Sequence, residues 1–261
     1  MTWELYAFRY GEQPNLSTSQ TVTHIKRLPK SSPPQPFCYF FWLARTKKTT
    51  ILIDCGFTSK QAAARGRTLL VNPEDLLGEI DIHPDEVDDL ILTHLHYDHA
   101  GNIDTFPKAR IHVHIDEWMW ATSPEMTVNK HARFYDPDII SKLIYRLYAG
   151  KLQFINDDHT FISGLWVKRL GGHCPGQMVV KIPTGDSYTV LASDAAHLSV
   201  NIEQQNPFPI MHDMSQMEKG LAYLSSLART GIRIVPGHDP NIYKIGTPVG
   251  ISGNVIALHE I

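Results

Sequence analysis

The feature that most constrains the fold is a run of coordinating side chains directly after a short apolar segment. Residues 89–92 are typical of a buried strand, and residues 94–99 follow with three histidines and one aspartate among them. These side chains cannot all share one face of a strand or of a helix. They converge if the strand ends at Thr93 and the chain then turns through a loop into a helix. The pattern therefore predicts a ligand cluster at a strand end.

Imidazole nitrogen and carboxylate oxygen are common ligands of zinc, so the cluster suggests a metal site. His94 and His96 lie two residues apart and share a face of an extended segment, whereas Asp98 and His99 fall beyond the expected turn. One pair can thus serve one metal ion and the other pair a second ion nearby. The alternative is a solvated, His-rich loop, which the buried strand immediately before the cluster disfavours.

The spacing His-x-His-x-Asp-His at a strand end resembles the signature of the metallo-β-lactamase superfamily. The other ligand positions of that superfamily follow downstream and in order. His173 lies in Gly-Gly-His-Cys-Pro-Gly, Asp194 follows a predicted strand at 188–192, and His238 lies in Val-Pro-Gly-His-Asp. An ordered set of seven positions is more specific than any one of these motifs.

The resemblance implies an α/β fold with four αββα layers, in which two mixed sheets pack face to face and helices lie outside. It also implies a site for two zinc ions, although such nitrogen and oxygen ligands also bind other divalent metals. The resemblance assigns the first ion to His94, His96 and His173, the second to Asp98, His99 and His238, and the bridging position to Asp194.

Within the superfamily the chain most resembles the N-acyl-homoserine lactone lactonases, which open the lactone ring of quorum-sensing signals. The overall size, the aspartate at 194 and the Pro-Gly-His-Asp at 236–239 support this resemblance. It implies a zinc-dependent hydrolase in which a metal-bridging hydroxide attacks the lactone. It also implies that Asp98 orients this nucleophile and passes its proton to the leaving group.

One position departs from the lactonase pattern. Those enzymes typically carry a tyrosine three residues after the bridging aspartate, where this chain has His197. An imidazole can donate the same kind of hydrogen bond to a substrate, or act as an acid near neutral pH. We therefore consider His197 a candidate catalytic and substrate-binding residue, with a structural role as the alternative.

Residues 1–261 contain no linker-like boundary and are predicted to form a single domain. Residues 116–150 have the pattern of a helical insertion, and in lactone-cleaving relatives this part of the chain forms much of the substrate pocket. We expect Trp118 and Phe134 to contact the substrate there.

Composition limits the partners. With 27 acidic and 24 basic residues and a net charge of −3, the chain lacks the basic surface typical of nucleic-acid binding. It also lacks an apolar run that could span a membrane, and its N-terminus lacks the features of a secretion signal. We therefore expect a small-molecule lactone as the substrate, neither a nucleic acid nor a membrane as a partner, and a cytoplasmic location. The aromatic-rich N-terminal arm also raises the hypothesis of a homodimer.

Other functions would use the same ligands. A dinuclear zinc hydrolase could act on another lactone, an ester, a thioester or a cyclic amide. A glyoxalase-type thioesterase normally adds a C-terminal helical domain. Only about twenty residues follow Asp239, which are too few for such a domain. A non-catalytic metal-binding protein is a further alternative, but such proteins commonly lose a ligand and none is missing here.

Three local predictions bear on the site. The alternation of residues 3–10 predicts a strand that ends at Gly11, and the polar, Pro-rich residues 12–36 predict a long loop or irregular arm. Asp54 lies in an Asp-x-Gly turn, and we expect it to orient a neighbouring loop by hydrogen bonds. Asp213 is predicted to begin an amphipathic helix.

Overall fold

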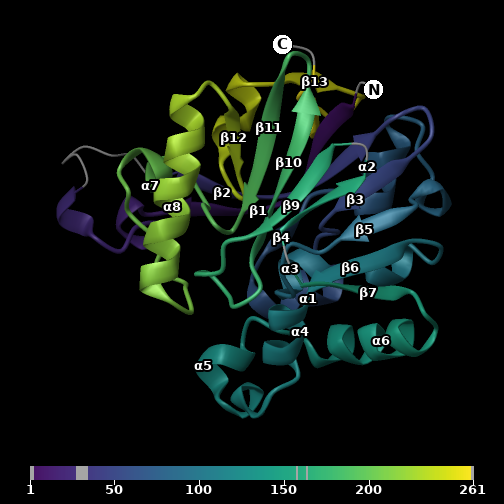
Figure 1. Cartoon of the computed structure of the whole chain (residues 1–261), viewed down its shortest axis with the longest axis horizontal. Coiled ribbons are helices and arrows are strands. Elements are labelled where there is room, and N and C mark those ends of the chain that lie inside the picture. The colour runs from purple at the N-terminus through teal and green to yellow at the C-terminus, as the bar shows by residue number, and fades with distance from the viewer. Residues whose placement is uncertain (1–2, 28–34, 157, 163, 260–261) are drawn as a thin grey trace.

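Two mixed β-sheets form the centre of the protein (Figure 1). The computed structural model describes residues 3–27, 35–156, 158–162 and 164–259. Within them the larger sheet has eight strands in a row and a ninth, β4 (Thr68–Leu69), beside its third strand. In spatial order the eight are β13 (Thr247–Val249), β14 (Val255–Ala257), β1 (Glu4–Leu16), β2 (Gln35–Arg45), β3 (Thr50–Ile53), β5 (Asp89–Ile91), β6 (Arg110–His114) and β7 (Leu152–Ile155).

The smaller sheet has five strands within the described part of the chain. In the larger sheet β3, β5, β6 and β7 run parallel to one another, and in the smaller sheet β11 and β12 run parallel. All other neighbouring strands are antiparallel. In spatial order the five are β12 (Arg233–Pro236), β11 (Ser187–Ser193), β10 (Met178–Thr184), β9 (Leu165–Arg169) and β8 (His159–Ile162).

Alternation of side chains along the strands creates separate cores. On β2, Phe41 joins a core with apolar residues of the helices outside the larger sheet, whereas the neighbouring Trp42 joins a core between the two sheets. On β10, Val180 faces this central core, and Val179 faces a third core outside the smaller sheet. Apolar side chains therefore project from both faces of each sheet, and each face packs against one of these cores.

Helices cover the outer faces. Figure 1 shows α8 along the outer side of the smaller sheet, where Leu221 and Leu224 pack against Val179 and Val190. The helix begins where Asp213 accepts a hydrogen bond from the backbone N–H of Gln216. The α-helices are α1 (Ser59–Arg65), α2 (Pro73–Gly78), α3 (Tyr97–Ala100), α4 (Ile115–Ala121), α5 (Asn129–Ala132), α6 (Pro137–Tyr148), α7 (Ser199–Glu203) and α8 (Met214–Arg229). The 3-10 helices are η1 (Thr18–Gln20), η2 (Ile25–Arg27), η3 (Pro84–Glu86), η4 (Ile103–Thr105), η5 (Pro124–Thr127) and η6 (Pro240–Lys244).

This arrangement confirms the predicted αββα fold with two mixed sheets. The predicted end of the first strand was wrong, because β1 continues past Gly11 to Leu16. Its polar second half still pairs with β2, through Glu12 opposite Cys38 and Gln13 opposite Phe37. The predicted arm at 12–36 therefore contains the end of β1, η1, η2 and the start of β2, and its residues 28–34 lie outside the described part of the chain.

A buried acid on β5, Asp89, links this strand to its neighbour β6. Both oxygens of Asp89 accept hydrogen bonds from the Arg110 guanidinium, and His112 Nε2 lies 2.7 Å from Asp89 Oδ1. Burial acts to raise the pKa of Asp89, but these hydrogen bonds outweigh it and lower the pKa below its usual value.

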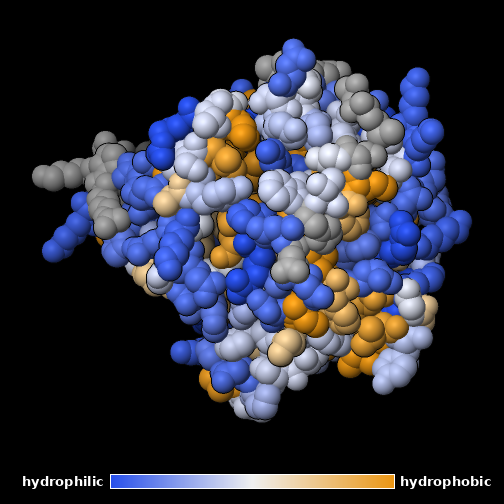
Figure 2. Space-filling model, in the orientation of Figure 1, coloured by the Kyte–Doolittle hydropathy of each residue, from blue (hydrophilic) through white to orange (hydrophobic). Residues whose placement is uncertain are grey.

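The segment from α4 to α6 lies at the β7 edge of the larger sheet, below the sheets in Figure 1. Figure 2 shows hydrophobic side chains gathered over α6 and β7, where Ile144 is 40% exposed. The pocket-forming role of this segment and the single-domain organisation remain predictions. Within the described residues no helix has the length and apolar character needed to cross a membrane.

Candidate metal centre

Most of the site is built from loops at the carboxyl ends of parallel strands, and His173 comes from the loop between the antiparallel strands β9 and β10. Chain segments leave the larger sheet after β3 and β5 and the smaller sheet after β11 and β12. Because parallel strands end at the same edge, the loops of each sheet lie together. The two edges meet where Thr93 Oγ1 lies 2.8 Å from Ser193 Oγ and where the Met178 N–H donates to the Thr93 carbonyl.

Asp54, directly after β3, holds the loop that carries the first histidines. Its carboxylate accepts hydrogen bonds of 2.8 Å from the N–H and the hydroxyl of Thr93, and it lies 2.8 Å from His99 Nδ1. Asp54 and Ser193 both have left-handed backbone, with φ of 59° and 46°. Such strained residues persist only where surrounding contacts fix them. The predicted orienting role of Asp54 is confirmed by these hydrogen bonds.

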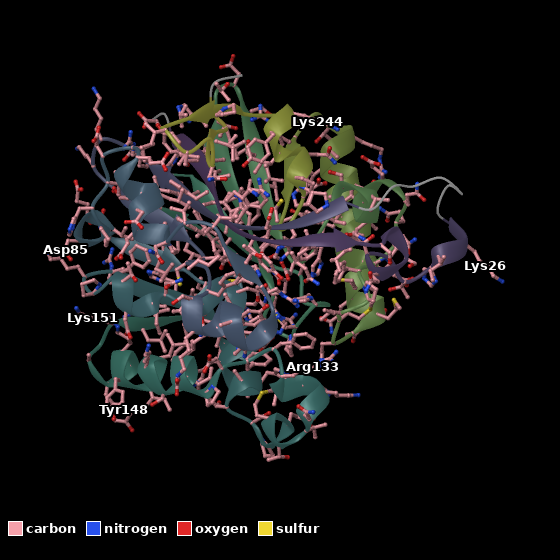
Figure 3. The ribbon with its side chains drawn as sticks, turned by 180° about the vertical axis from the view of Figure 1, so that it is seen from behind. Lys26, Asp85, Arg133, Tyr148, Lys151 and Lys244 are labelled. Carbon is pink, nitrogen blue, oxygen red and sulfur yellow. The ribbon has the colours of Figure 1, made fainter. Side chains whose placement is uncertain are left out.

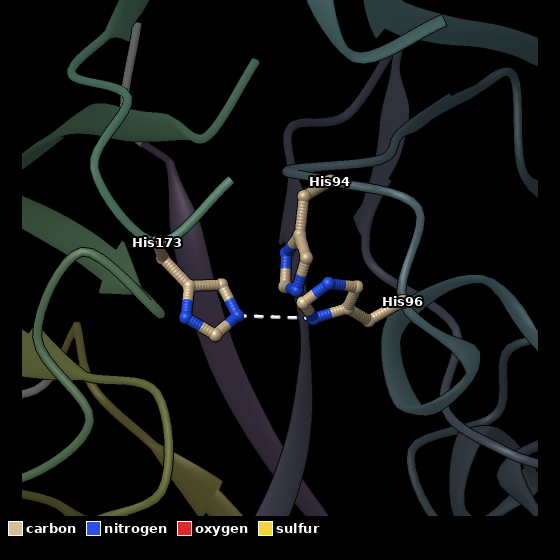
Figure 4. Close-up of side chains that lie close together, drawn as sticks. All are labelled: His94, His96 and His173. Carbon is tan, nitrogen blue, oxygen red and sulfur yellow. Dashed lines mark hydrogen bonds between the residues drawn. The ribbon is translucent and has the colours of Figure 1, made fainter. Parts of the chain in front are cut away.

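All seven predicted ligands, together with His197, converge in overlapping groups. In each group the potential ligand atoms lie within 4.8 Å of one another. Figure 4 shows one group, in which His173 Nε2 lies 3.0 Å from His96 Nδ1. The groups are His94, His96 and His173; His94, His99 and Asp194; Asp98, His99 and His238; and His173, Asp194 and His197.

Asp194 lies between two sets of imidazoles. Its Oδ1 is 3.0 Å from His238 Nε2 and 3.3 Å from His99 Nε2. Its Oδ2 is 3.2 Å from His173 Nε2 and 3.9 Å from His94 Nε2. Each oxygen thus faces a different set, which is the geometry that a carboxylate needs to bridge two metal ions.

Backbone carbonyls fix the orientation of two of these rings. His173 Nδ1 lies 2.9 Å from the carbonyl oxygen of Ile210, and His238 Nδ1 lies 2.8 Å from that of Cys38. A carbonyl accepts only from a protonated nitrogen, so Nδ1 carries the proton and Nε2 presents a lone pair. Both Nε2 atoms point toward Asp194. Metal-binding histidines are commonly held in this way.

One further observation indicates that these nitrogen and oxygen atoms fit a metal ion. His94 Nε2 is buried and has no hydrogen-bond partner among the described residues. An unpaired buried polar atom of this kind costs about 1–3 kcal/mol, which coordination would remove. Burial lowers the pKa of His94 and His96, and neighbouring imidazoles add to this effect, so both rings stay neutral and keep a lone pair.

His197 lies against the central carboxylate. Its Nε2 is 3.0 Å from Asp194 Oδ2, and its ring stacks on Phe208 with centroids 3.9 Å apart. Burial acts to raise the pKa of Asp194, but the imidazoles of His197 and His238 outweigh it and hold this pKa well below its usual value. The carboxylate is therefore ionised. A role of His197 toward substrate remains a prediction.

A cavity of about 450 Å³ opens over the cluster, which is a size typical of small-molecule sites. Phe134 lines it, with its ring centroid 5.2 Å from that of His96. Trp118 is not among the described residues that line this cavity, and its ring packs 5.8 Å from that of Phe154. The structure therefore brings Phe134 to the site and leaves Trp118 outside it.

The comparison with known protein families agrees with this geometry. The family model of the metallo-beta-lactamase superfamily matches residues 32–238, which span most of the chain and include all seven predicted ligands. The chain belongs to this superfamily. The resemblance drawn from the motifs is thereby confirmed at the level of the family.

Individual superfamily members similar to the chain include lactonases. The N-acyl homoserine lactonase AiiB of Rhizobium rhizogenes is 24% identical over 216 residues, which cover 76% of this chain and 78% of that protein. A crystal structure of a quorum-quenching N-acyl homoserine lactone lactonase matches with a TM-score of 0.77 at 23% identity, covering 96% and 99% of the two chains. AidC, described as a dizinc quorum-quenching lactonase in complex with a product, matches with a TM-score of 0.73 at 19% identity, covering 99% and 95%.

The structure adds a buried acid that the motifs did not indicate. Glu117 on α4 is fully buried and accepts hydrogen bonds from the Leu95 N–H and the Tyr135 hydroxyl through Oε1, and from the Gly176 N–H through Oε2. It thereby ties the loop of the first two histidines to the loop of the third. A Cβ on Gly176 would lie 2.3 Å from that of Glu117, so this contact requires glycine. In the sequence Glu117 is only one of two acids in a short helix.

Three arginines of the cavity wall were also missed. Arg65 ends α1, Arg67 follows two residues later, and Arg133 follows α5. Arg133 lies far from the other two in the sequence, so the three arginines form no motif. Only the folded chain brings them to the same cavity.

Proposed function

We propose that the protein is a zinc-dependent hydrolase that opens a lactone ring, with an N-acyl-homoserine lactone as the expected substrate. The observation that carries the proposal is the position of Asp194, whose two oxygens face separate sets of imidazoles beside a substrate-sized cavity. The similar proteins named as lactonases support the reaction, and the one described as dizinc supports the metal.

In this proposal two zinc ions are held by the seven predicted ligands. When bound, zinc lowers the pKa of water and polarises a carbonyl oxygen, which is the chemistry that ester cleavage needs. The first site consists of His94, His96 and His173, the second of Asp98, His99 and His238, and Asp194 belongs to both.

Asp98 is the proposed proton carrier. Its carboxylate lines the cavity with its Oδ2 3.8 Å from His99 Nε2, and its backbone carbonyl accepts a 2.6 Å hydrogen bond from the Tyr10 hydroxyl. A carboxylate at this position can take the proton of the attacking water and return it to the ring oxygen as the acyl C–O bond breaks. His197 and Phe134, on the same wall, are the proposed contacts of the lactone and its acyl chain. Because Trp118 lies outside the cavity lining, the proposal does not include it.

The test is proton release by the zinc-loaded protein with lactones of several ring types and acyl lengths. We expect turnover of N-acyl-homoserine lactones that falls about a hundredfold or more in Asp98→Asn, because general acid–base catalysis contributes about 10²–10⁴-fold. Asp186→Asn is the matched control, because Asp186 is exposed in the turn between β10 and β11. Zinc content measured by mass spectrometry should be two ions per chain.

The possible results of this experiment distinguish the candidate functions. Lactone turnover that persists in Asp98→Asn would refute the role of Asp98. Bound zinc without lactone turnover would refute the lactonase and direct the search to other esters, thioesters and cyclic amides. Bound zinc without turnover of any of these would favour a non-catalytic metal-binding protein.

The proposal also includes a cytoplasmic location and a homodimer. Both rest on the sequence alone, and the homodimer rests on the aromatic-rich N-terminal arm. Sedimentation of the purified protein at micromolar concentration tests the dimer. A mass near 29.5 kDa would refute it.

A further inference from the structure

The three arginines on the cavity wall have no carboxylate partner. Neither Arg65, Arg67 nor Arg133 forms an ion pair within 4.0 Å with a carboxylate of the described residues. Several arginines elsewhere in the described chain do form such pairs, namely Arg9, Arg45, Arg110 and Arg169. Arg67 shares a side-chain hydrogen bond with Tyr97, but the cavity still concentrates positive charge that no carboxylate of the described residues pairs with.

Aromatic side chains hold these guanidinium groups in place. The guanidinium carbon of Arg65 lies 4.1 Å from the ring centroid of Tyr97, and that of Arg133 lies 4.6 Å from the ring centroid of Phe134. Stacking uses the flat face of a guanidinium and leaves its in-plane N–H donors available, although one N–H of Arg65 reaches a backbone carbonyl at 3.5 Å. Nε of Arg67 is buried without a hydrogen-bond partner among the described residues.

The two carboxylates of the cavity lining are engaged elsewhere. Asp98 Oδ2 faces His99, and Asp194 is surrounded by imidazoles. Metal ions held by these same residues would add further positive charge to the cavity. Figure 3 shows Arg133 between the α4–α6 segment and the sheets, whereas Tyr148 of α6 points away from the molecule and is 88% exposed. Arg133 is exposed to solvent, and it also lines the cavity.

We infer that the substrate carries a carboxylate at the end remote from the bond that is cleaved. Guanidinium groups match the planar carboxylate with paired N–H donors, and charge-assisted hydrogen bonds of this kind are stronger than neutral ones. A purely alkyl acyl chain would make no use of the three cations. The inference rests on the proposed ring opening, in which water adds across the acyl C–O bond, and the remote carboxylate serves for binding and stays unchanged.

The test compares two lactones that differ at one end. N-adipoyl- and N-hexanoyl-homoserine lactone have the same six-carbon acyl chain, which ends in a carboxylate in the first and in a methyl group in the second. We expect the zinc-loaded protein to prefer the adipoyl lactone by about tenfold or more in kcat/KM. This preference should decrease between about 20 mM and about 500 mM NaCl, because salt screens charge interactions.

Arginine variants then locate the interaction. Arg67→Gln and Arg133→Gln should each reduce the adipoyl-to-hexanoyl preference by about threefold or more. Arg229→Gln is the matched control, because Arg229 is exposed at the end of α8 and does not line the cavity, and it should keep the wild-type preference. Equal kcat/KM for the two lactones in the wild type, or equal losses for both in the arginine variants, would overturn the inference.

A binding measurement separates this inference from the proposed function. If neither lactone is hydrolysed, the proposed function fails, and calorimetry with the ring-opened products N-adipoyl- and N-hexanoyl-homoserine tests the arginines alone. Tighter binding of the adipoyl compound that is lost in Arg67→Gln would support the anion site without lactonase activity. Equal binding of both compounds would overturn it.

Discussion

Replacing Glu117 by glutamine should loosen two ligand loops at once. The carboxylate receives three hydrogen bonds, from the N–H groups of Leu95 and Gly176 at 3.1 Å and from the Tyr135 hydroxyl at 2.9 Å. A glutamine has nearly the same shape but only one oxygen. If that oxygen keeps the two donors at Oε1, the amide NH₂ faces the Gly176 N–H, and two donors then oppose each other.

The cost follows from these contacts. One buried N–H without an acceptor costs about 1–3 kcal/mol, and the two remaining hydrogen bonds lose the contribution of the charge, which is about 0.5–1 kcal/mol each. We therefore expect Glu117→Gln to lower the free energy of unfolding by about 2–5 kcal/mol. At roughly 2 °C per kcal/mol for a chain of this size, that corresponds to a decrease in Tm of roughly 4–10 °C. Zinc affinity should fall by about tenfold or more, because the loops that it fixes carry His94, His96 and His173.

Thermal unfolding of the zinc-free and zinc-loaded proteins measures the first effect, and competition with a chromogenic chelator measures the second. Tyr135→Phe is the matched control, because it removes one of the three donors and leaves the carboxylate with both backbone N–H groups. It should cost about 1.5–3 kcal/mol, the contribution of one hydrogen bond to a charged group, and leave zinc affinity within about threefold. A Tm of Glu117→Gln within about 1 °C of the wild type, with unchanged zinc affinity, would refute the idea that this acid holds the loops together.

Three further outcomes are expected. In Gly237→Ala the new Cβ would lie 2.8 Å from Asp194 Oδ1, so the displaced carboxylate should reduce bound zinc from two ions to about one per chain, and an unchanged zinc content would contradict the bridging role. Because the folded-state pKa of Asp89 is lowered, its contribution to stability is present above pH ~4 and is lost as the pH falls through that lowered value. Asp89→Asn should therefore flatten the decrease of the urea-unfolding free energy below about pH 4, and an unchanged decrease at acid pH would show that Asp89 does not contribute. Removal of metal by a chelator should lower Tm, and zinc at about 100 times its Kd should restore about 2.7 kcal/mol of stability, whereas a Tm insensitive to zinc would argue against a metal centre in the folded protein.

The ligand cluster at residues 94–99 was predictable because its signal is local, whereas the three downstream positions were assigned by the family resemblance. A strand end can be recognised from a short apolar run, and His94, His96, Asp98 and His99 lie within six residues of one another. The start of α8 was predictable for the same reason, because Asp213 caps the helix through a residue three positions away.

Features that depend on distant partners were not predictable. The second half of β1 has a polar sequence, and only its pairing with β2 makes it a strand. Whether Trp118 or Phe134 reaches the cavity depends on how α4 and the chain after α5 pack, which no local pattern encodes. Glu117 is a clear case, because its partners Leu95 and Gly176 belong to two loops that are far apart in the sequence.

The spread of the ligands along the chain has a consequence for how the protein is made. At roughly 5–20 residues per second, the ribosome needs roughly 7–30 s to proceed from His94 to His238. During this time the nascent chain carries the early histidines without the aspartate and the histidine that face them across the two sheets. In the proposed dizinc enzyme, the complete two-metal site can therefore form only after residue 238 has been synthesised, so its completion would be a late event of biogenesis.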